Sequence, residues 1–263
     1  MHFITKTLRV GWALFKVSAI ADLQMRFNLL MQFFNDILWY SVQIILFETI
    51  YLHINTLGGW GVAETRVFLG VLFLVDGIHM IFFAYNFDHF SAKIARGELD
   101  LLLLKPVSTQ QLFTSQRLQC GFIPNVLLAL GWLTWALTGL PGGFPWSRCG
   151  LILVVVPAGV SVFYATRLLF CLPVMLFKQG GDLHELYFTF FRLGLRPDRL
   201  YGPGLRYLVL MVIPVAMFAS VPTRILLDPF DGWLIVGLIS WAVFLLWLAN
   251  RLWHYALHRY SSS

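Results

Sequence analysis

Charge is scarce in this chain. Asp, Glu, Lys and Arg together make up only 12% of its 263 residues, whereas a soluble domain carries about 25%. Hydrophobic residues make up 59%. Such a composition cannot cover a water-facing surface of this size, so it excludes soluble enzymes, nucleic-acid-binding proteins and secreted disulfide scaffolds. The class that remains is an all-α polytopic membrane protein, with a single transmembrane domain over residues 1–263.

Cysteine is sparse as well. Cys120, Cys149 and Cys171 lie far apart with no C-x-x-C spacing, which argues against a disulfide framework and a structural zinc site. The chain also lacks any Gly-Lys dipeptide and therefore has no P-loop to hold nucleotide phosphates. We expect a protein that is not an enzyme and that has no catalytic, cofactor or metal site of its own.

Six apolar runs are long enough to span a bilayer, which takes about 20 residues. They are Phe27 to Ile50, Arg66 to Tyr85, Gln116 to Leu140, Leu151 to Phe177, Leu205 to Val221 and Trp233 to Asn250. In this layout fifteen of the 19 basic residues fall on one side, and only Arg66, Arg148 and Arg224 on the other. Because Lys and Arg remain in the cytoplasm, both termini are predicted to be cytoplasmic. We expect no removable signal peptide.

Three shorter segments are predicted to lie at the membrane surface. Residues 1–24 carry an apolar stripe flanked by Lys6, Arg9 and Lys16, which indicates an interfacial helix on the inner side; the alternative is a simple tail before the first span. Residues 179–203 combine regularly spaced leucines and aromatics with arginines, which predicts a cytoplasmic amphipathic helix. Residues 219–232 are too apolar for a solvated loop and predict outer re-entrant half-helices.

Residues 86–108, between the second and third spans, do not resemble a passive linker. A short helix with an apolar face is predicted to end near Arg96, where Gly97 supplies a left-handed terminator. After it, Leu99 and residues 101–104 form an apolar patch that ends before Pro106. Such a patch in the cytosol must be covered. The alternative is that this patch returns into the bilayer as the foot of the third span.

Charged residues inside the spans mark a pathway or a buried pair. At about 1.5 Å per residue, Asp36, Asp76 and Arg167 lie at similar depths. We therefore predict an intramembrane charge cluster of these three residues, which either links the spans or contacts substrate. In a secondary transporter or channel, the alternative function, the same residues would relay protons.

The sequence Gly-Glu-Leu-Asp-Leu-Leu-Leu-Leu-Lys-Pro-Val at residues 97–107 resembles a signature of type-2 ABC exporter permeases. In the bacterial six-span group this signature reads Gly-x-Leu-Asp-x-Leu-Leu-x-(Lys/Arg)-Pro. Residues 212–217 and 221–226 are similar to the fifth span of that group and the proline-bearing exit after it. Residues 182–201 depart from the group, which has a compact Ser-Arg-Tyr-Pro element there.

The resemblance implies a permease subunit that forms half of an export pathway in the bacterial inner membrane. A cytoplasmic ABC ATPase dimer would bind ATP and Mg, and a second copy or a related permease would complete the pathway. In such exporters the segment after the second span docks on the ATPase. The residues at that place, including those of the bracing motif, are Phe87, Phe90, Lys93, Ile94, Arg96, Gly97, Leu99, Asp100 and Pro106.

The resemblance also implies that the first, second and fifth spans line the pathway. The first span has a polar face, since Asn28, Gln32 and Asn35 recur at helical spacing, and such a face should turn away from lipid. Together with the other two spans this gives a predicted lining of Asn28, Gln32, Asn35, Phe68, Leu72, Met211, Val215 and Phe218. The alternative is ordinary packing within the subunit.

Overall fold

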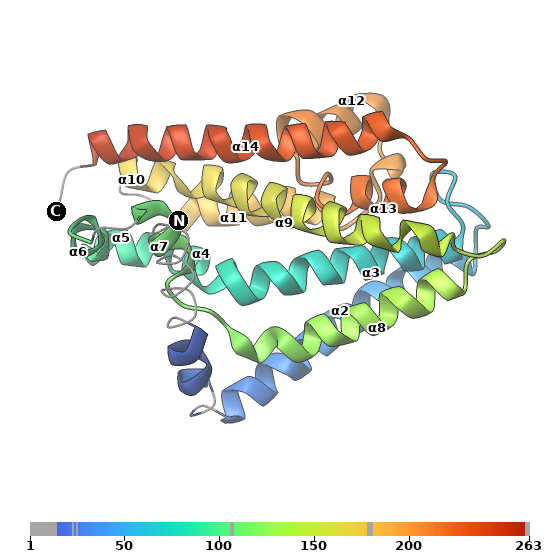
Figure 1. Cartoon of the computed structure of the whole chain (residues 1–263), viewed down its shortest axis with the longest axis horizontal. Helices are drawn as coiled ribbons and strands as arrows, with labels where there is room; N and C mark the ends of the chain where they lie inside the picture. The colour runs from blue at the N-terminus through green and yellow to red at the C-terminus, as the bar shows by residue number, and fades with distance from the viewer. Residues whose placement is uncertain (1–14, 23, 25, 106–107, 178–180, 261–263) are drawn as a thin grey trace.

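The structure, a computed structural model, describes residues 15–22, 24, 26–105, 108–177 and 181–260, which are largely helical and contain no β-strand. The longest helices lie side by side along one axis (Figure 1): α2 (Arg26–Tyr51), α3 (Val62–His79), α8 (Ile123–Thr138), α9 (Cys149–Cys171) and α14 (Gly232–Arg259). Five helical segments of the described chain are long and apolar enough to cross a membrane: Leu29–Tyr51, Val62–Asp88, Cys120–Thr138, Trp146–Leu176 and Gly232–Arg259. The prediction of an all-α polytopic membrane protein is confirmed.

The bundle has two distinct ends (Figure 1). Four short helices gather at one end beside the C-terminal part of α14: α4 (Tyr85–Asp88), α5 (Phe90–Ala95), α6 (Glu98–Leu103) and α7 (Thr109–Ser115). We call this the terminal end. The opposite end, which we call the loop end, carries the connections α2–α3, α8–α9 and α13–α14.

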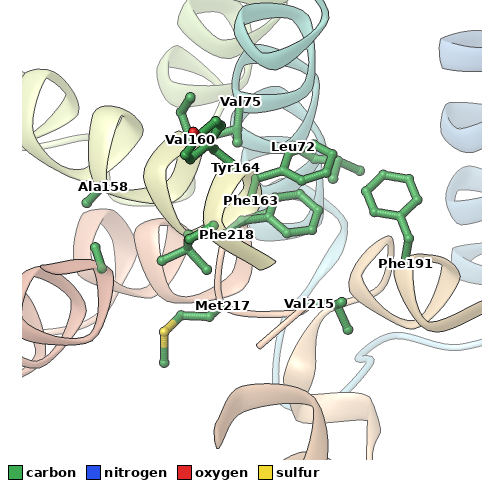
Figure 2. Close-up of a cluster of buried hydrophobic side chains, with 14 of the residues drawn as sticks. Leu72, Val75, Ala158, Val160, Phe163, Tyr164, Phe191, Val215, Met217 and Phe218 are labelled. Carbon is green, nitrogen blue, oxygen red and sulfur yellow. The ribbon is translucent and has the colours of Figure 1, made fainter. Parts of the chain in front are cut away.

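Helix α3 occupies the centre of the bundle, and nearly all its side chains are buried against α8 and α9. Beside it lies an aromatic cluster in which Phe163 of α9 stacks on Phe218 and Phe191, at ring-centroid distances of 4.8 and 5.2 Å. Figure 2 shows these three rings with Leu72 of α3 in the same cluster. Offset ring pairs of this kind add about 0.5–1.5 kcal/mol each beyond the area they bury, so the cluster holds three parts of the chain together.

The fifth crossing differs from the prediction. The short helix α10 (Pro173–Phe177) ends at the terminal end and α14 begins at the loop end, so the intervening chain must cross. Helix α11 (Gly181–Gly194) runs along α9. After it, Arg199 pairs with Asp228 and lies over the Trp60 ring at the loop end.

Two predictions are therefore wrong. The described part of residues 179–203, from residue 181 onward, is not confined to the terminal end, because it runs from one end of the bundle to the other. Residues 205–221 are not the fifth span, because they fold back on themselves. Helix α12 (Pro203–Tyr207) and a π-helical turn, η5 (Leu208–Val212), are followed by a turn and then by α13 (Ser220–Leu227), which ends at the loop end. Of these elements only α13 falls within residues 219–232, where half-helices are expected; α12 and η5 lie mainly in the stretch predicted as the fifth span.

Glycines allow this re-entrant hairpin to enter the bundle. Its turn, residues 213–219, passes between Gly159 of α9 and Gly194 of α11. A Cβ atom on Gly194 would overlap the carbonyl oxygen of Val215, and one on Gly159 would overlap that of Phe218. The hairpin is also tied at its base by Asp198, which is fully buried and accepts a hydrogen bond of 2.8 Å from Nε of Arg206.

Of the predicted interfacial helix, residues 15–22 and 24 are described, and they are helical. Lys6 and Arg9 lie outside the described residues. The hydroxyl of Ser18 accepts a bond of 3.1 Å from the Leu118 N–H, and Asp22 accepts one of 3.3 Å from the Gly121 N–H. Val17 and Ile20 are exposed. The polar side of this helix faces the protein and its apolar side faces outward, as expected beside lipid.

Candidate functional site

A cavity of about 470 Å³ opens between α2, α3 and α11. Its lining consists of Asn35, Asp36, Trp39, Gln43, Leu46, Asp76, Met80, Phe188, Phe191, Arg192, Leu195 and Arg196. The aromatic and aliphatic walls carry carboxylates from α2 and α3 and, from α11 and the residues after it, two arginines. A cavity with apolar walls and a few charged groups of both signs suits an amphiphilic ligand.

The predicted charge cluster is separated in the structure. Asp36 and Asp76 both line the cavity, and Asp36 accepts a hydrogen bond from the amide of Asn125. Arg167 instead donates from Nη2 to Oδ1 of Asp88. Arg167 thus makes its ion pair with Asp88 rather than with Asp36 or Asp76, because the end of the α3–α4 helix places Asp88 within reach of the guanidinium.

Aromatic rings surround this ion pair. The guanidinium carbon of Arg167 lies 5.3, 5.5 and 5.8 Å from the ring centroids of Phe87, Tyr187 and Phe188, within the range of cation–π attraction. The side chain of Arg167 is 5% exposed and that of Asp88 45%. The positive group is thus sealed in, while its partner reaches the surface.

Only part of the predicted pathway lining meets the cavity. Asn35 lines it, while the side chain of Asn28 lies outside the described set and Gln32 is partly buried elsewhere on α2. Four of the predicted residues are buried in the core and cannot line an opening of this chain: Phe68, Leu72, Val215 and Phe218. For these four the alternative, ordinary packing, is correct. Met211 is exposed and lines a separate hollow beside α12.

The cavity residues of α11 were missed because their segment was placed outside the membrane. A signal was present, since Phe188 and Phe191 are closely followed by Arg192 and Arg196 in one short stretch. Strong amphipathicity is typical of an interfacial helix, but it also suits a helix between an apolar core and a polar cavity.

Helix α2 is the most exposed of the membrane-crossing helices. Phe34, Leu38 and Val42 project outward, which suits lipid, but the polar Asn35 is exposed as well. A polar side chain in the hydrocarbon region needs a cavity or a partner helix. Asn35 meets this need at the cavity, which opens beside α2.

At the terminal end, the predicted docking residues point inward. Phe87, Phe90, Ile94 and Leu99 are at most 5% exposed. The ring of Phe90 meets Phe113 edge-on at 5.0 Å. In the described structure the chain itself covers these side chains, and their packing holds the segment in place.

Within the described part of residues 86–108, the exposed large apolar side chains belong to the motif that begins at Gly97. From the sequence, we expect this motif only to support the docking residues. Gly97 has the predicted left-handed backbone, with φ of 69°, and starts α6. Asp100 is partly buried, and Arg96 is exposed and pairs with Glu98 at 3.2 Å. The exposed apolar residues of this stretch are Leu101, Leu103 and Leu104, which we call the leucine face. Pro106 lies outside the described residues.

Lys93 has an unusual environment for a lysine. Its side chain is 3% exposed, and Nζ donates a 2.9 Å hydrogen bond to Oδ1 of Asn86. Burial lowers the pKa of this ammonium to about 8; the Glu98 carboxylate opposes the shift, and the Arg96 and Arg117 guanidinium groups add to it. The folded protein therefore holds this proton less firmly than the unfolded chain does.

Stability should accordingly rise with pH. Between about pH 8 and the unperturbed lysine value of 10.5, the unfolded state binds more protons, so alkalinity favours the folded state. The gain is at most about 1.4 kcal/mol per pH unit. Unfolding in a neutral detergent between pH 7.5 and 9.5 measures it, and Lys93→Met should flatten the profile. Equal slopes in both proteins would exclude Lys93 as the source.

Comparison with known proteins gives one match. A protein-family model described as "ABC-2 family transporter protein" matches residues 37–263. No curated protein and no solved structure matched the chain. The matched region contains α3 to α14 and the part of α2 from residue 37 onward, and therefore the leucine face and every residue of the cavity lining except Asn35 and Asp36.

Proposed function

Because the chain belongs to the ABC-2 family of transporter proteins and is an ABC-type permease, we propose that it forms half of an export pathway driven by a separate cytoplasmic ATPase. ATP and Mg would bind to that ATPase. The terminal end would face the cytoplasm of a bacterial cell, with both chain termini on that side of the inner membrane.

The leucine face is the observation that carries the proposed coupling. Leu101 on α6 and Leu104 at its C-terminal end are 66% and 83% exposed, while Leu99 and Leu102 of the same helix are buried against the rest of the chain. An exposed apolar patch on a fixed support is typical of a protein-binding surface. In the chain, α3 is followed by α4, α5 and then α6. A force applied at the leucine face would therefore be transmitted through α5 and α4 to α3.

A second permease, either another copy or a related chain, would complete the pathway. The exposed polar residues of α2 support this, since they need a polar neighbour within the membrane. The cavity between α2, α3 and α11 opens beside the same helix. The conduit would then be bounded by Asp36, Asp76 and Arg192 together with their counterparts.

Replacing the leucine face should detach the ATPase. The tagged wild-type chain is purified from its cell membrane with the ATPase that accompanies it, and Leu101→Ser/Leu104→Ser is compared with it. Loss of the buried area of two leucines should reduce the bound ATPase about 10- to 100-fold. The matched control is Leu52→Ser, which changes a leucine of 82% exposure at the loop end and should leave the complex intact.

Retention of the ATPase by the double variant would refute this docking surface. If the wild-type chain carries no ATPase and moves solute along an ion gradient in proteoliposomes, the energy source itself is wrong. The proton-relay alternative lacks support from geometry, since Arg167 contacts Asp88 and not the cavity carboxylates.

A further inference from the structure

A second and larger cavity lies at the terminal end and takes no part in the proposed transport. Its volume is about 640 Å³. The residues that line it come from the first helical segment, the α3–α6 region and the stretch around α7: Val17, Ser18, Ala21, Gln24, Tyr85, His89, Lys93, Arg96, Glu98, Lys105, Leu112, Gln116 and Arg117.

The charge of this cavity is strongly unbalanced. Four of the lining side chains, Lys93, Arg96, Lys105 and Arg117, are basic, and Glu98 is the single carboxylate among the lining residues described. Lys93 is buried and Arg117 partly buried, while Arg96 and Lys105 are exposed, so the cavity joins an enclosed cation to cations that reach solvent. Neighbouring guanidinium groups also contribute to the depressed pKa of Lys93, since they oppose its charge. An excess of basic side chains around one cavity favours an anionic ligand.

The basic groups are fixed in position. The guanidinium carbon of Arg117 lies 4.2 Å from the ring centroid of Tyr85, and the ring of His89 stacks on the same tyrosine at 4.2 Å. Asn86 accepts from Nζ of Lys93 and donates to the carbonyl oxygen of Arg117, at 2.9 and 2.8 Å. Positions held in advance reduce the entropy that a ligand must overcome on binding.

The surroundings identify the source of the anion. One wall of the cavity is the helix of residues 15–22, where Val17 lines the cavity and is 66% exposed and the nearby Ile20 is 58% exposed. These apolar side chains belong in lipid. The opposite wall carries Tyr85, near the end of the span Val62–Asp88, and tyrosine is common at the level of the headgroups. The cavity therefore opens at the bilayer surface.

We propose that this cavity binds the headgroup phosphate of an anionic phospholipid. The phosphodiester oxygens would accept hydrogen bonds from Arg117, Lys93 and Lys105, and the acyl chains would leave past Val17 and Ile20. Basic pockets at the cytoplasmic membrane surface suit such headgroups, and arginine binds phosphate oxygens in a bidentate manner. The bound lipid fastens the first helix to the α3–α6 region. The site does not depend on the proposed export function.

The test compares lipids and matched variants in the full-length protein. Thermal unfolding is recorded in neutral detergent with added phosphatidylcholine, phosphatidylglycerol, or phosphatidylcholine plus millimolar inorganic phosphate. Phosphatidylglycerol should raise the unfolding midpoint of the wild type by about 3–6 °C. Lys105→Gln/Arg117→Gln should lose most of this shift. The control Arg251→Gln/Arg259→Gln removes the same charge from exposed positions of α14 and should keep it.

Each other outcome overturns the proposal. Equal stabilisation of both double variants would mean a general charge effect. The same shift with inorganic phosphate alone would make the ligand a free anion, and a shift produced by the ATPase but not by phosphatidylglycerol would make the cavity a protein contact.

If Lys105→Gln/Arg117→Gln fails to fold, the exposed single change Lys105→Gln replaces it. Phosphatidylglycerol should also remove the rise of wild-type stability above pH 8, and an unchanged slope would contradict binding beside Lys93.

Discussion

Replacing Asp88 with Ala is expected to destabilise the protein by about 3–5 kcal/mol, the usual cost of leaving a buried charge without its partner. Arg167 has a 5% exposed side chain and donates to this carboxylate. Without Asp88 its guanidinium stays enclosed by Phe87 and Tyr187 and loses its carboxylate acceptor. Chemical unfolding in mixed micelles measures the loss, and transport should fall with it.

The reverse change should cost less. In Arg167→Met the remaining carboxylate of Asp88 is 45% exposed and can be hydrated, so we expect about 1–2 kcal/mol, mainly from lost packing. The double variant Asp88→Ala/Arg167→Met should be more stable than Asp88→Ala alone, because it contains no buried guanidinium without an ion-pair partner. Additive losses in this cycle would show that the two residues act independently.

A second double-mutant cycle tests Asp76, one of the two carboxylates that line the cavity. Asp76→Ala combined with Arg167→Met should give a coupling energy smaller than that of the Asp88 cycle, since Asp76 makes no direct contact with the guanidinium in the described structure. A larger coupling through Asp76 would restore the charge cluster that the sequence suggests.

The long spans could be predicted from the sequence because a run of about 20 apolar residues is a local property. The predicted first span, residues 27–50, agrees with the observed segment Leu29–Tyr51 to within two residues. The predicted sixth span begins within one residue of Gly232 but ends too early, since α14 continues to Arg259. Its last turns remain helical because Trp253 is fully buried at the terminal end against Phe90 and Phe113.

The fifth crossing could not be predicted in this way. Helix α11 has only 14 residues and includes Arg192, so hydropathy favours the apolar stretch after it. That stretch is apolar for another reason, since a hairpin that enters the bundle must also bury its side chains. The count of basic residues on each side of the membrane also placed Arg199 at the wrong end. Arg199 is paired with Asp228 at the loop end, and a neutralised arginine is a weak topology signal.

The sequence predicts which residues share a face but not which face is covered. The helical spacing of Phe87, Phe90 and Ile94 correctly indicated one apolar face on the segment after α3. Whether that face meets a partner or its own chain depends on Phe113 and Trp253, which lie farther along the sequence. The leucine face was visible as a patch, and only the fold shows that it remains exposed.

Replacing Gly194 with Ala is expected to destabilise the protein by about 2–3 kcal/mol, within the range for overpacked cores. The added Cβ would overlap the carbonyl oxygen of Val215 and lie 2.9 Å from Cε1 of Phe218. A backbone atom cannot move aside as a side-chain end can, so the re-entrant turn must shift. Gly159→Ala should act on the other side of the same turn, where the new atom meets the carbonyl oxygen of Phe218.

A matched control has the opposite expected sign. Gly131 lies on the exposed surface of α8, where an added methyl group would meet open space, so Gly131→Ala should stabilise the helix by about 0.5–1 kcal/mol. Unfolding of the three variants in the same detergent distinguishes crowding from a general effect of glycine replacement. Because Phe191 stacks on Phe163 and Phe218, a displaced turn should also change the wall of the cavity beside α11. Wild-type stability in Gly194→Ala together with unchanged transport would show that the hairpin does not enter the bundle between α9 and α11.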